Sequence, residues 1–392
     1  MTKDHQTAQP HISEQIVRLC TSSESVSSLL ARDSTLSPGN AWEKLYGHHV
    51  TKAAEKNTHE VDKANNESNS EPTEHLKLKK AAECGKWGPT KPSDLFLAIY
   101  HDALSTLNED PRRAMVSPSL MGSYGTVPLT IISVLPDIAR HMSNVIVRAQ
   151  KEVYLATNYW QNSVASRYIT NAIRELDRRA GARGARIVFK ILYDRGSPRQ
   201  LYKPHYVVSE KAATSHKVNL PHPDEIPNID MEIMNFHTPL LGTFHAKYLL
   251  VDRRIALLQS NNIQDNDNLE MMVHLEGPIV DSFYDMALTT RLSEVEEEPV
   301  TGEVVEKSTV HFPECAVSLN ATTLPDRSVR QEPFALLAHT ADDPHYDDDI
   351  TGEIARIQSF LAPRPGRTHL QAVTELLNHT VNEATPHIQW PL

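Results

Sequence analysis

A strand, a helix and a second strand follow one another between residues 152 and 193, and this order limits the fold more than any other part of the chain. Residues 152–157 and 185–193 are almost continuously apolar, as in strands that are covered on both faces. Apolar residues recur at helical spacing between them, from Val164 to Arg179. Two such strands joined by a helix form a right-handed parallel crossover, so the sequence predicts an α/β domain.

Further periodic segments extend this domain on both sides. The predicted elements are a helix capped at Ser93, a helix at 136–149, strands at 231–236 and 269–275, and a helix from 277 to about 292. Because strands and helices alternate along most of this length, we expect a mixed sheet flanked by helices.

Composition divides the 392 residues into three parts. Residues 1–91 are polar, and residues 51–75 contain almost no large apolar side chain, so we expect this region to be mostly disordered apart from a short helix within 12–30. Residues 92–292 form the predicted domain. Residues 293–392 are acidic and irregular, and are expected to be a solvated linker with short helices.

The most informative stretch is FHAKYLLVDRRIALLQSNN, residues 244–262. His245 and Lys247 are two positions apart, so on a strand their side chains share a face and an imidazole lies beside an ammonium group. Asp252 follows Lys247 after four residues. Six more residues lead to a polar tetrad that ends in Asn262, where a second strand would run into a turn.

This pattern resembles the HKD motif of the phospholipase D superfamily, whose usual ending, GGxN or GSxN, is here Gln259-Ser260-Asn261-Asn262. The segment ATNYWQNS at 156–163 also resembles the family, above all its two-motif lipid enzymes. The resemblance covers residues 136–292. It implies a phospholipase D-like mixed sheet flanked by helices with a single HKD half, the N-terminal half of a two-motif, cardiolipin-synthase-like member.

The resemblance also implies a role for each motif residue. His245 would attack phosphorus to form a phosphohistidine, while the donors of Lys247, Asn262 and Ser260 would hold the phosphate oxygens. This chemistry requires no metal, and no cofactor is implied. The predicted catalytic set is His245, Lys247, Asp252 and Glu270, and the predicted substrate-binding set is Asn262 and Ser260.

Two members of these sets have supporting roles in the family. Asp252 would support the fold of the motif, and Glu270 would hydrogen bond to the catalytic imidazole and fix its tautomer. The alternatives are a Glu270 that faces water at a strand end and a His245 that is a hydrogen-bonded core residue. Arg195, after the strand that ends at Tyr193, either reaches the site or is a solvated turn residue.

The chain contains one complete motif, whereas the family's site uses two histidines. His75 and Lys77 repeat HxK, but Ala82 stands where Asp is required. Three interpretations remain: a homodimer that pairs two His245 residues, an N-terminal half whose second half is separate or missing, or a noncatalytic remnant. Residues 388–392 resemble an interruption more than a natural end of the reading frame.

The expected activity is phosphodiester transfer or hydrolysis on phospholipids, and an aromatic turn at Tyr159-Trp160 would suit a membrane surface. The alternatives are a dimeric nuclease and a phospholipid-binding half-domain without turnover. A formal net charge of −11 argues against nonspecific electrostatic binding of nucleic acid. The expected partners are therefore a phospholipid substrate, a peripheral membrane surface, and a second copy or a second HKD-containing half.

Cysteine use and hydropathy indicate the compartment. The three cysteines, Cys20, Cys84 and Cys315, show no paired spacing, so neither a disulfide framework nor a zinc site is indicated. No stretch has the length of a membrane-spanning helix, and the N-terminus lacks an apolar signal segment. A cytoplasmic protein with peripheral membrane contact is expected. A metal site at Asp343 and His345 can be imagined, but solvated linker is the default there.

Overall fold

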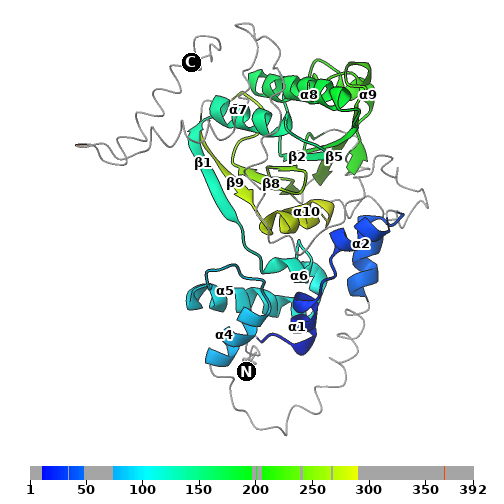
Figure 1. The fold of residues 1–392 in the computed structure, drawn as a ribbon. Coiled ribbons are helices and arrows are strands. Elements are labelled where there is room, and N and C mark those ends of the chain that lie inside the picture. The colour runs from blue at the N-terminus through cyan, green and yellow to red at the C-terminus, as the bar shows by residue number, and fades with distance from the viewer. Residues whose placement is uncertain are drawn as a thin grey trace, which may run out of the picture. The chain divides into compact units, whose positions relative to one another are not determined.

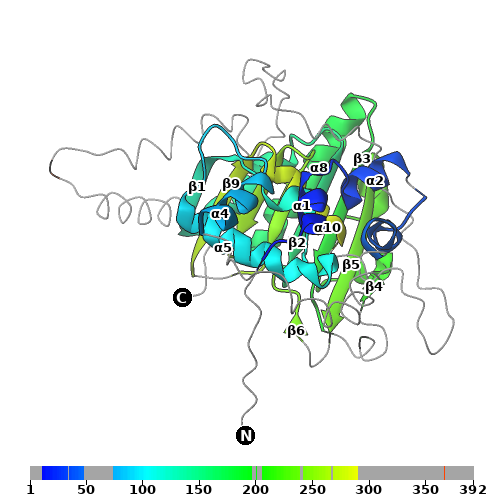
Figure 2. The ribbon, with the colours of Figure 1, turned by 90° about the horizontal axis from the view of Figure 1, so that it is seen from below.

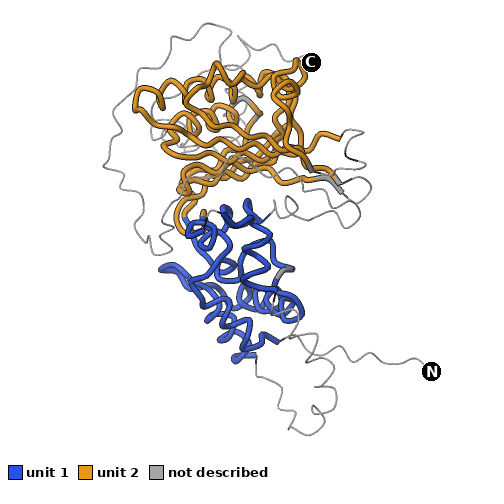
Figure 3. Tube along the Cα trace, turned by 90° about the vertical axis from the view of Figure 1, so that its right-hand side faces the viewer, with its two compact units in different colours: residues 1–125, 281–305, 314–322 blue, residues 126–280, 306–313, 323–392 orange. Residues whose placement is uncertain are grey.

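The fold is described from a computed structural model, which describes residues 11–33, 35–47, 74–196, 200, 205–238, 242–265, 268–289 and 366. The chain divides into two compact units (Figure 3). Residues up to Gly125, together with the part of the last helix that begins at Asp281, belong to the first unit. Residues 126–280 make up the main part of the second unit, which carries the motif.

A mixed sheet dominates the second unit, and its described residues form nine strands. They are β1 (Thr126–Val134), β2 (Glu152–Thr157), β3 (Ile187–Tyr193), β4 (His205–Val207), β5 (Ile229–Thr238), β6 (Gly242–Thr243), β7 (Tyr248–Val251), β8 (Ile255–Gln259) and β9 (Leu269–Glu276). The order across the sheet is β1-β9-β8-β7-β2-β3-β5-β4, and β6 pairs with β5 (Figure 2). Strands β2, β3 and β5 are parallel, and the remaining pairs are antiparallel. The predicted α/β class with a mixed sheet is confirmed.

Two helices cover one face of this sheet, α7 (Leu135–Ile146) and α8 (Val164–Ala182) (Figure 1). Helix α8 begins where predicted, because Ser163 and Ser166 form a reciprocal capping box. Its apolar stripe, which includes Ile169 and Leu176, is fully buried with Phe189 of β3 in one continuous core. The strand, helix and strand between residues 152 and 193 therefore fold as one parallel crossover.

Strand β1 was not expected from the sequence. Its apolar run contains Pro128, which cannot donate a hydrogen bond to a neighbouring strand. The structure tolerates this residue because β1 is an edge strand, and its register with β9 shifts between Thr126 and Leu129.

The described residues of the first unit include helices within 1–91, a region that was expected to be mostly disordered. Its described elements are α1 (Glu14–Thr21), α2 (Val26–Arg32), a helical segment at 38–47, α4 (Glu74–Glu83), α5 (Asp94–Ser105), the short helices η1 (Thr106–Asn108) and η2 (Pro111–Arg113), α6 (Pro118–Met121), and most of α10 (Ile279–Thr289). Ile12 and Ile16 are buried against Leu104 of α5. The few apolar residues of this region thus form a core because they pack against residues that are distant in the sequence. The unit boundary at Gly125 also differs from the domain start expected at residue 92.

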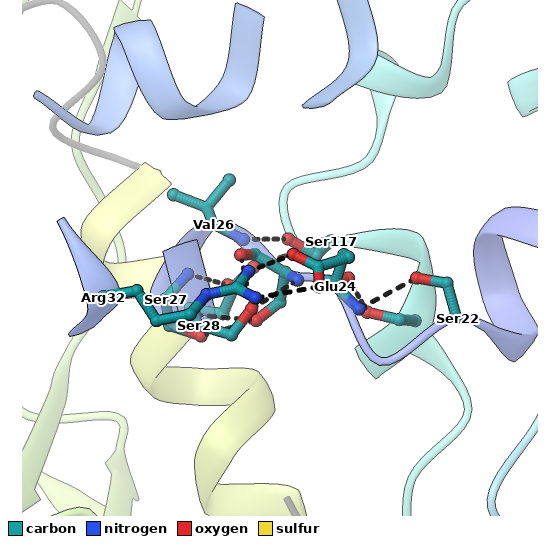
Figure 4. A network of polar contacts seen from close by, with 10 residues as sticks. Ser22, Glu24, Val26, Ser27, Ser28, Arg32 and Ser117 are labelled. Carbon is teal, nitrogen blue, oxygen red and sulfur yellow. Dashed lines mark hydrogen bonds and ion pairs between the residues drawn. The ribbon is translucent and has the colours of Figure 1, made fainter. Parts of the chain in front are cut away.

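A buried carboxylate joins three segments of this unit. Asp285 of α10 is fully buried and accepts backbone N–H bonds from Ser27 and Ser117, each at 2.8 Å. The Ser117 hydroxyl in turn accepts the N–H of Val26, and Glu24 pairs with Arg32 beside it (Figure 4). Because charged hydrogen bonds of this kind are stronger than neutral ones, Asp285 ties α2 and α6 to α10.

Two of the cysteines meet in this unit although their spacing gave no sign of it. Cys20 and Cys84 are buried in one core cluster as free thiols. The hydrogen bond between them, together with burial, raises the pKa of Cys20. Within the described ranges, no helix combines the length and the apolar character needed to cross a bilayer. Cys315 and the acidic segment with Asp343 and His345 lie outside the described residues.

Candidate active site

The predicted histidine and lysine come together at the start of β7. His245 is exposed, and Lys247 is buried directly before the strand. The Nζ atom of Lys247 lies 3.3 Å from Nδ1 and 3.4 Å from Nε2 of the His245 ring, and it donates to the His245 carbonyl oxygen at 2.8 Å. An accessible imidazole therefore lies next to the ammonium group of a buried lysine, which is the pairing that the spacing predicted.

Burial changes the electrostatics of this ammonium group. Desolvation lowers the pKa of Lys247 below its usual value of 10.5, and the negative charge of Glu270 opposes that shift. A cation that is poorly hydrated gains more from an incoming anion than a solvated one does. Lys247 is thus suited to bind a phosphate oxygen beside His245.

The backbone just before His245 is clamped by the ends of two parallel strands. Asp194, which follows β3 and is buried, accepts the N–H of Phe244 at 2.9 Å. Asn158, which follows β2, donates from its side chain to the Phe244 carbonyl at 2.8 Å. Both backbone polar groups of Phe244 are thereby hydrogen bonded, so the backbone that leads into the motif is fixed.

The polar tetrad lies next to Lys247. The backbone N–H of Gln259 donates to the Lys247 carbonyl at 3.2 Å, and Ile263 after the tetrad is anchored on Tyr159 at 3.1 Å. Among the described residues, both amide atoms of Gln259 and the side-chain oxygen of Asn262 are buried with no hydrogen-bond partner. A buried amide without a hydrogen bond costs free energy, so a ligand that hydrogen bonds to these atoms would be favoured here.

Ser260 and Glu270 form a pair that differs from the predicted contacts. The Ser260 hydroxyl donates to Glu270 Oε2 and accepts the backbone N–H of Met271 at 2.8 Å. The hydrogen bond expected between Glu270 and the His245 imidazole stays a prediction. In this structure Ser260 holds Glu270, and the negative charge of Glu270 acts on Lys247.

Asp252 lies at the other end of β7 from His245. Its two carboxylate oxygens accept the backbone N–H groups of Gln150, Lys151 and Glu152 at 2.7, 2.8 and 3.0 Å. Asp252 thus fixes the start of β2 against the β7–β8 turn. The length of β7 separates its carboxylate from the imidazole, and the role of Asp252 in the catalytic set stays a prediction.

Two further expectations concern the aromatic turn after β2. Trp160 is fully buried and donates from its ring nitrogen to Val218, so it is not available to a membrane surface. Arg195 donates to the Trp160 carbonyl at 2.9 Å and lies over the Tyr159 ring at 5.6 Å. Through these contacts the Arg195 side chain holds the aromatic turn in place.

The comparisons concern the fold. NucT from Helicobacter pylori is 19% identical over 42% of this chain and 96% of its own, with a TM-score of 0.28. Nuc from Salmonella typhimurium, titled a phospholipase D family member, is 15% identical over 41% and 91%, with a TM-score of 0.27. Phosphatidylserine synthase from Haemophilus influenzae is 12% identical over 53% and 47%, with a TM-score of 0.27, so the chain spans about half of that protein. No family model matches the chain, and no curated protein matches it.

One pair near the site was missed by the sequence interpretation. His237, close to the end of β5, contacts Asp194 Oδ1 through Nδ1 at 2.7 Å. The signal that could have found it is topological, since β3 and β5 are parallel neighbours and ligands of open sheets gather at the carboxyl ends of such strands. The described residues contain no group of three or more side chains suited to hold a metal ion.

Proposed function

We propose that this chain is a phospholipase D-type phosphodiesterase or phosphatidyltransferase that acts on phospholipids through a phosphohistidine at His245. The observation that carries the proposal is the exposed imidazole of His245 with the buried Nζ of Lys247 at 3.3 Å. The imidazole would form a bond to phosphorus as the bond to the leaving alcohol breaks. The ammonium group, with the amide donors of Gln259 and Asn262, would offset the charge that develops on the phosphate oxygens.

The choice of phospholipid rests on an exposed apolar strip beside the site. Ile132 of β1 and Met271 of β9 are direct partners across the sheet, so they share a face with Leu269. These three side chains are 44%, 48% and 57% exposed. Met271 is bonded through its backbone to Ser260, so the strip borders the tetrad. An apolar strip next to a phosphate site favours a substrate with acyl chains.

The test compares the purified chain with His245→Ala on vesicles of phosphatidylcholine or phosphatidylglycerol and on single-stranded DNA. We expect release of head group from vesicles, and a loss on the order of 10⁴-fold or more in the variant. His216→Ala is the matched control, because His216 is also exposed but lies in a loop. Its activity should stay within about twofold.

Three results would contradict the proposal. Undiminished turnover by His245→Ala would remove the mechanism. Cleavage of single-stranded DNA alone would favour the nuclease interpretation. Vesicle binding without any turnover would favour a phospholipid-binding half-domain.

A further inference from the structure

Helix α5 of the first unit is apolar on two sides. Its inner side packs Leu97, Tyr100 and Leu104 into the core of that unit. Leu95 and Ile99, which lie one turn apart on the other side, are 72% and 63% exposed. Because a surface helix normally has a single apolar side, the exposed outer side of α5 indicates a second partner.

Two aromatic rings extend this outer side. Phe96, next to Leu95, is 48% exposed. Its ring lies 5.6 Å from that of half-buried Trp87, edge to face, and the Trp87 ring nitrogen donates to the Ala82 carbonyl at 2.8 Å. We call Trp87, Leu95, Phe96 and Ile99 the α5 patch. Exposed apolar side chains that cluster in this way mark interaction sites, whereas single ones do not.

The charge near the α5 patch is positive, although the whole chain carries a formal net charge of −11. Residues 76–93 contain five lysines and a single acidic residue. Lys86 and Lys91, on either side of Trp87, are exposed, and so is Lys79 on α4. An anionic surface is the partner that complements these charges.

The two acidic residues of α5 limit the patch to the first half of the helix. Asp94 lies about 200° around the helix from Phe96, on the side away from the patch. Asp102, one turn after Ile99, contacts the His101 ring at 3.1 Å. The apolar and basic side chains therefore gather at the start of α5 and in the loop before it.

We propose that the α5 patch is a docking surface for bilayers that contain anionic phospholipid. Its apolar and aromatic side chains enter the boundary between head groups and acyl chains, and Lys86 and Lys91 meet the lipid phosphates. Apolar rings and lysines side by side are typical of helices that lie in this boundary. The inference concerns binding and not turnover, so it goes beyond the proposed function and does not depend on His245.

The experiment measures binding of the full chain to vesicles by co-sedimentation. All proteins carry His245→Ala, so that turnover does not alter the lipid. The vesicles are phosphatidylcholine alone, or phosphatidylcholine with about one third phosphatidylglycerol. We expect binding to the anionic vesicles to be at least about tenfold tighter, and to weaken as salt rises from about 0.1 to 0.5 M.

Two double variants test the patch. Leu95→Gln with Ile99→Gln retains good helix formers and should lower the partition coefficient about 10²-fold, because two apolar side chains no longer enter the lipid. Lys86→Gln with Lys91→Gln should lower it about tenfold or more on anionic vesicles alone. Met115→Gln is the control and should stay within about twofold, since Met115 is 62% exposed in the same unit but lies outside α5.

Three results would overturn the inference. They are binding without preference for anionic vesicles, equal binding by the Leu95→Gln, Ile99→Gln variant and its control, and a dimer of the parent chain that this variant dissociates, which would assign the patch to a second copy. Circular dichroism checks the fold of each variant, and the lysine variant decides the case if the other one unfolds. Failure of the proposed function is distinct, since it appears as undiminished turnover by His245→Ala, which vesicle binding does not measure.

Discussion

The two ends of β7 use polar groups in opposite ways. At the far end, the carboxylate of Asp252 accepts three backbone N–H groups, and Arg253 pairs with buried Glu152 at 2.6 Å. At the near end, Lys247 is desolvated and both amide atoms of Gln259 lack a partner within the described residues. The motif thus has two parts. At the far end, the anchor, polar side chains pair with groups of the protein, whereas at the near end buried polar atoms remain that a ligand could bind.

This difference shows which motif residues stabilise the fold and which bind a ligand. A satisfied buried group contributes to folding, whereas an unsatisfied one costs stability unless something binds to it. The backbone agrees, because Asp252 and Arg253 adopt left-handed conformations with φ of 52° and 54° to close the β7–β8 turn. Substitutions at the near end should therefore change activity, and those at the far end should change stability.

Among the substitutions that compare the two ends of β7, the largest effect is expected for Lys247→Met. Removing the donor should lower kcat/KM on phosphatidylcholine by about 10²–10³-fold, since a preorganised charge next to the phosphate is lost. The free energy of unfolding should be unchanged or higher, because a desolvated charge is replaced by an apolar chain of similar length. Steady-state kinetics and urea unfolding measure the two quantities. Lys217→Met, at an exposed lysine, is the control. A strong loss of stability in Lys247→Met would instead show that Lys247 stabilises the fold.

Asp252→Ala tests the other end of the strand. Losing three charged hydrogen bonds to backbone should lower the free energy of unfolding by about 3 kcal/mol. Activity per folded molecule should stay within about threefold, because Asp252 does not reach the imidazole. Urea unfolding and active-site titration provide the measurement, with Asp224→Ala as the control at an exposed aspartate. Lost activity with unchanged stability would instead show that Asp252 has a catalytic role.

The sequence predicted what depends on local pattern. The strand, helix and strand from β2 to β3 and the adjacency of His245 and Lys247 follow from periodicity over a few residues. The bond between His237 and Asp194 joins residues 43 positions apart, and no local pattern encodes it. The same holds for the core of the first unit, where Ile12 packs with Leu104. Long-range packing decides such contacts, so they were missed.

The pH dependence of activity and of stability should further distinguish the near end of β7, which carries Lys247, from the far end. Burial lowers the pKa of Lys247, so activity should decline on the alkaline side at a pH below 10.5, where the ammonium group loses its proton. The native state then binds fewer protons than the unfolded chain, so stability should rise with pH between the lowered pKa and 10.5. Lys247→Arg, whose charge persists in this range, should abolish both trends. Rate and unfolding profiles between pH 7 and about 10.5 check this, and identical profiles for the two proteins would refute it.

The smallest effect is expected for Ser260→Ala, which removes the link between the tetrad and Glu270. The hydroxyl that donates to Glu270 and accepts from Met271 contributes about 1 kcal/mol, so kcat/KM should fall by about fivefold. Ser260→Thr retains both bonds and should restore most of that loss. If Ser260 instead bound the phosphate directly, the alanine variant would lose about 10²-fold or more, as expected for a transition-state donor. Kinetics of the two variants thus decide whether Ser260 belongs to the anchoring or to the binding part of the motif.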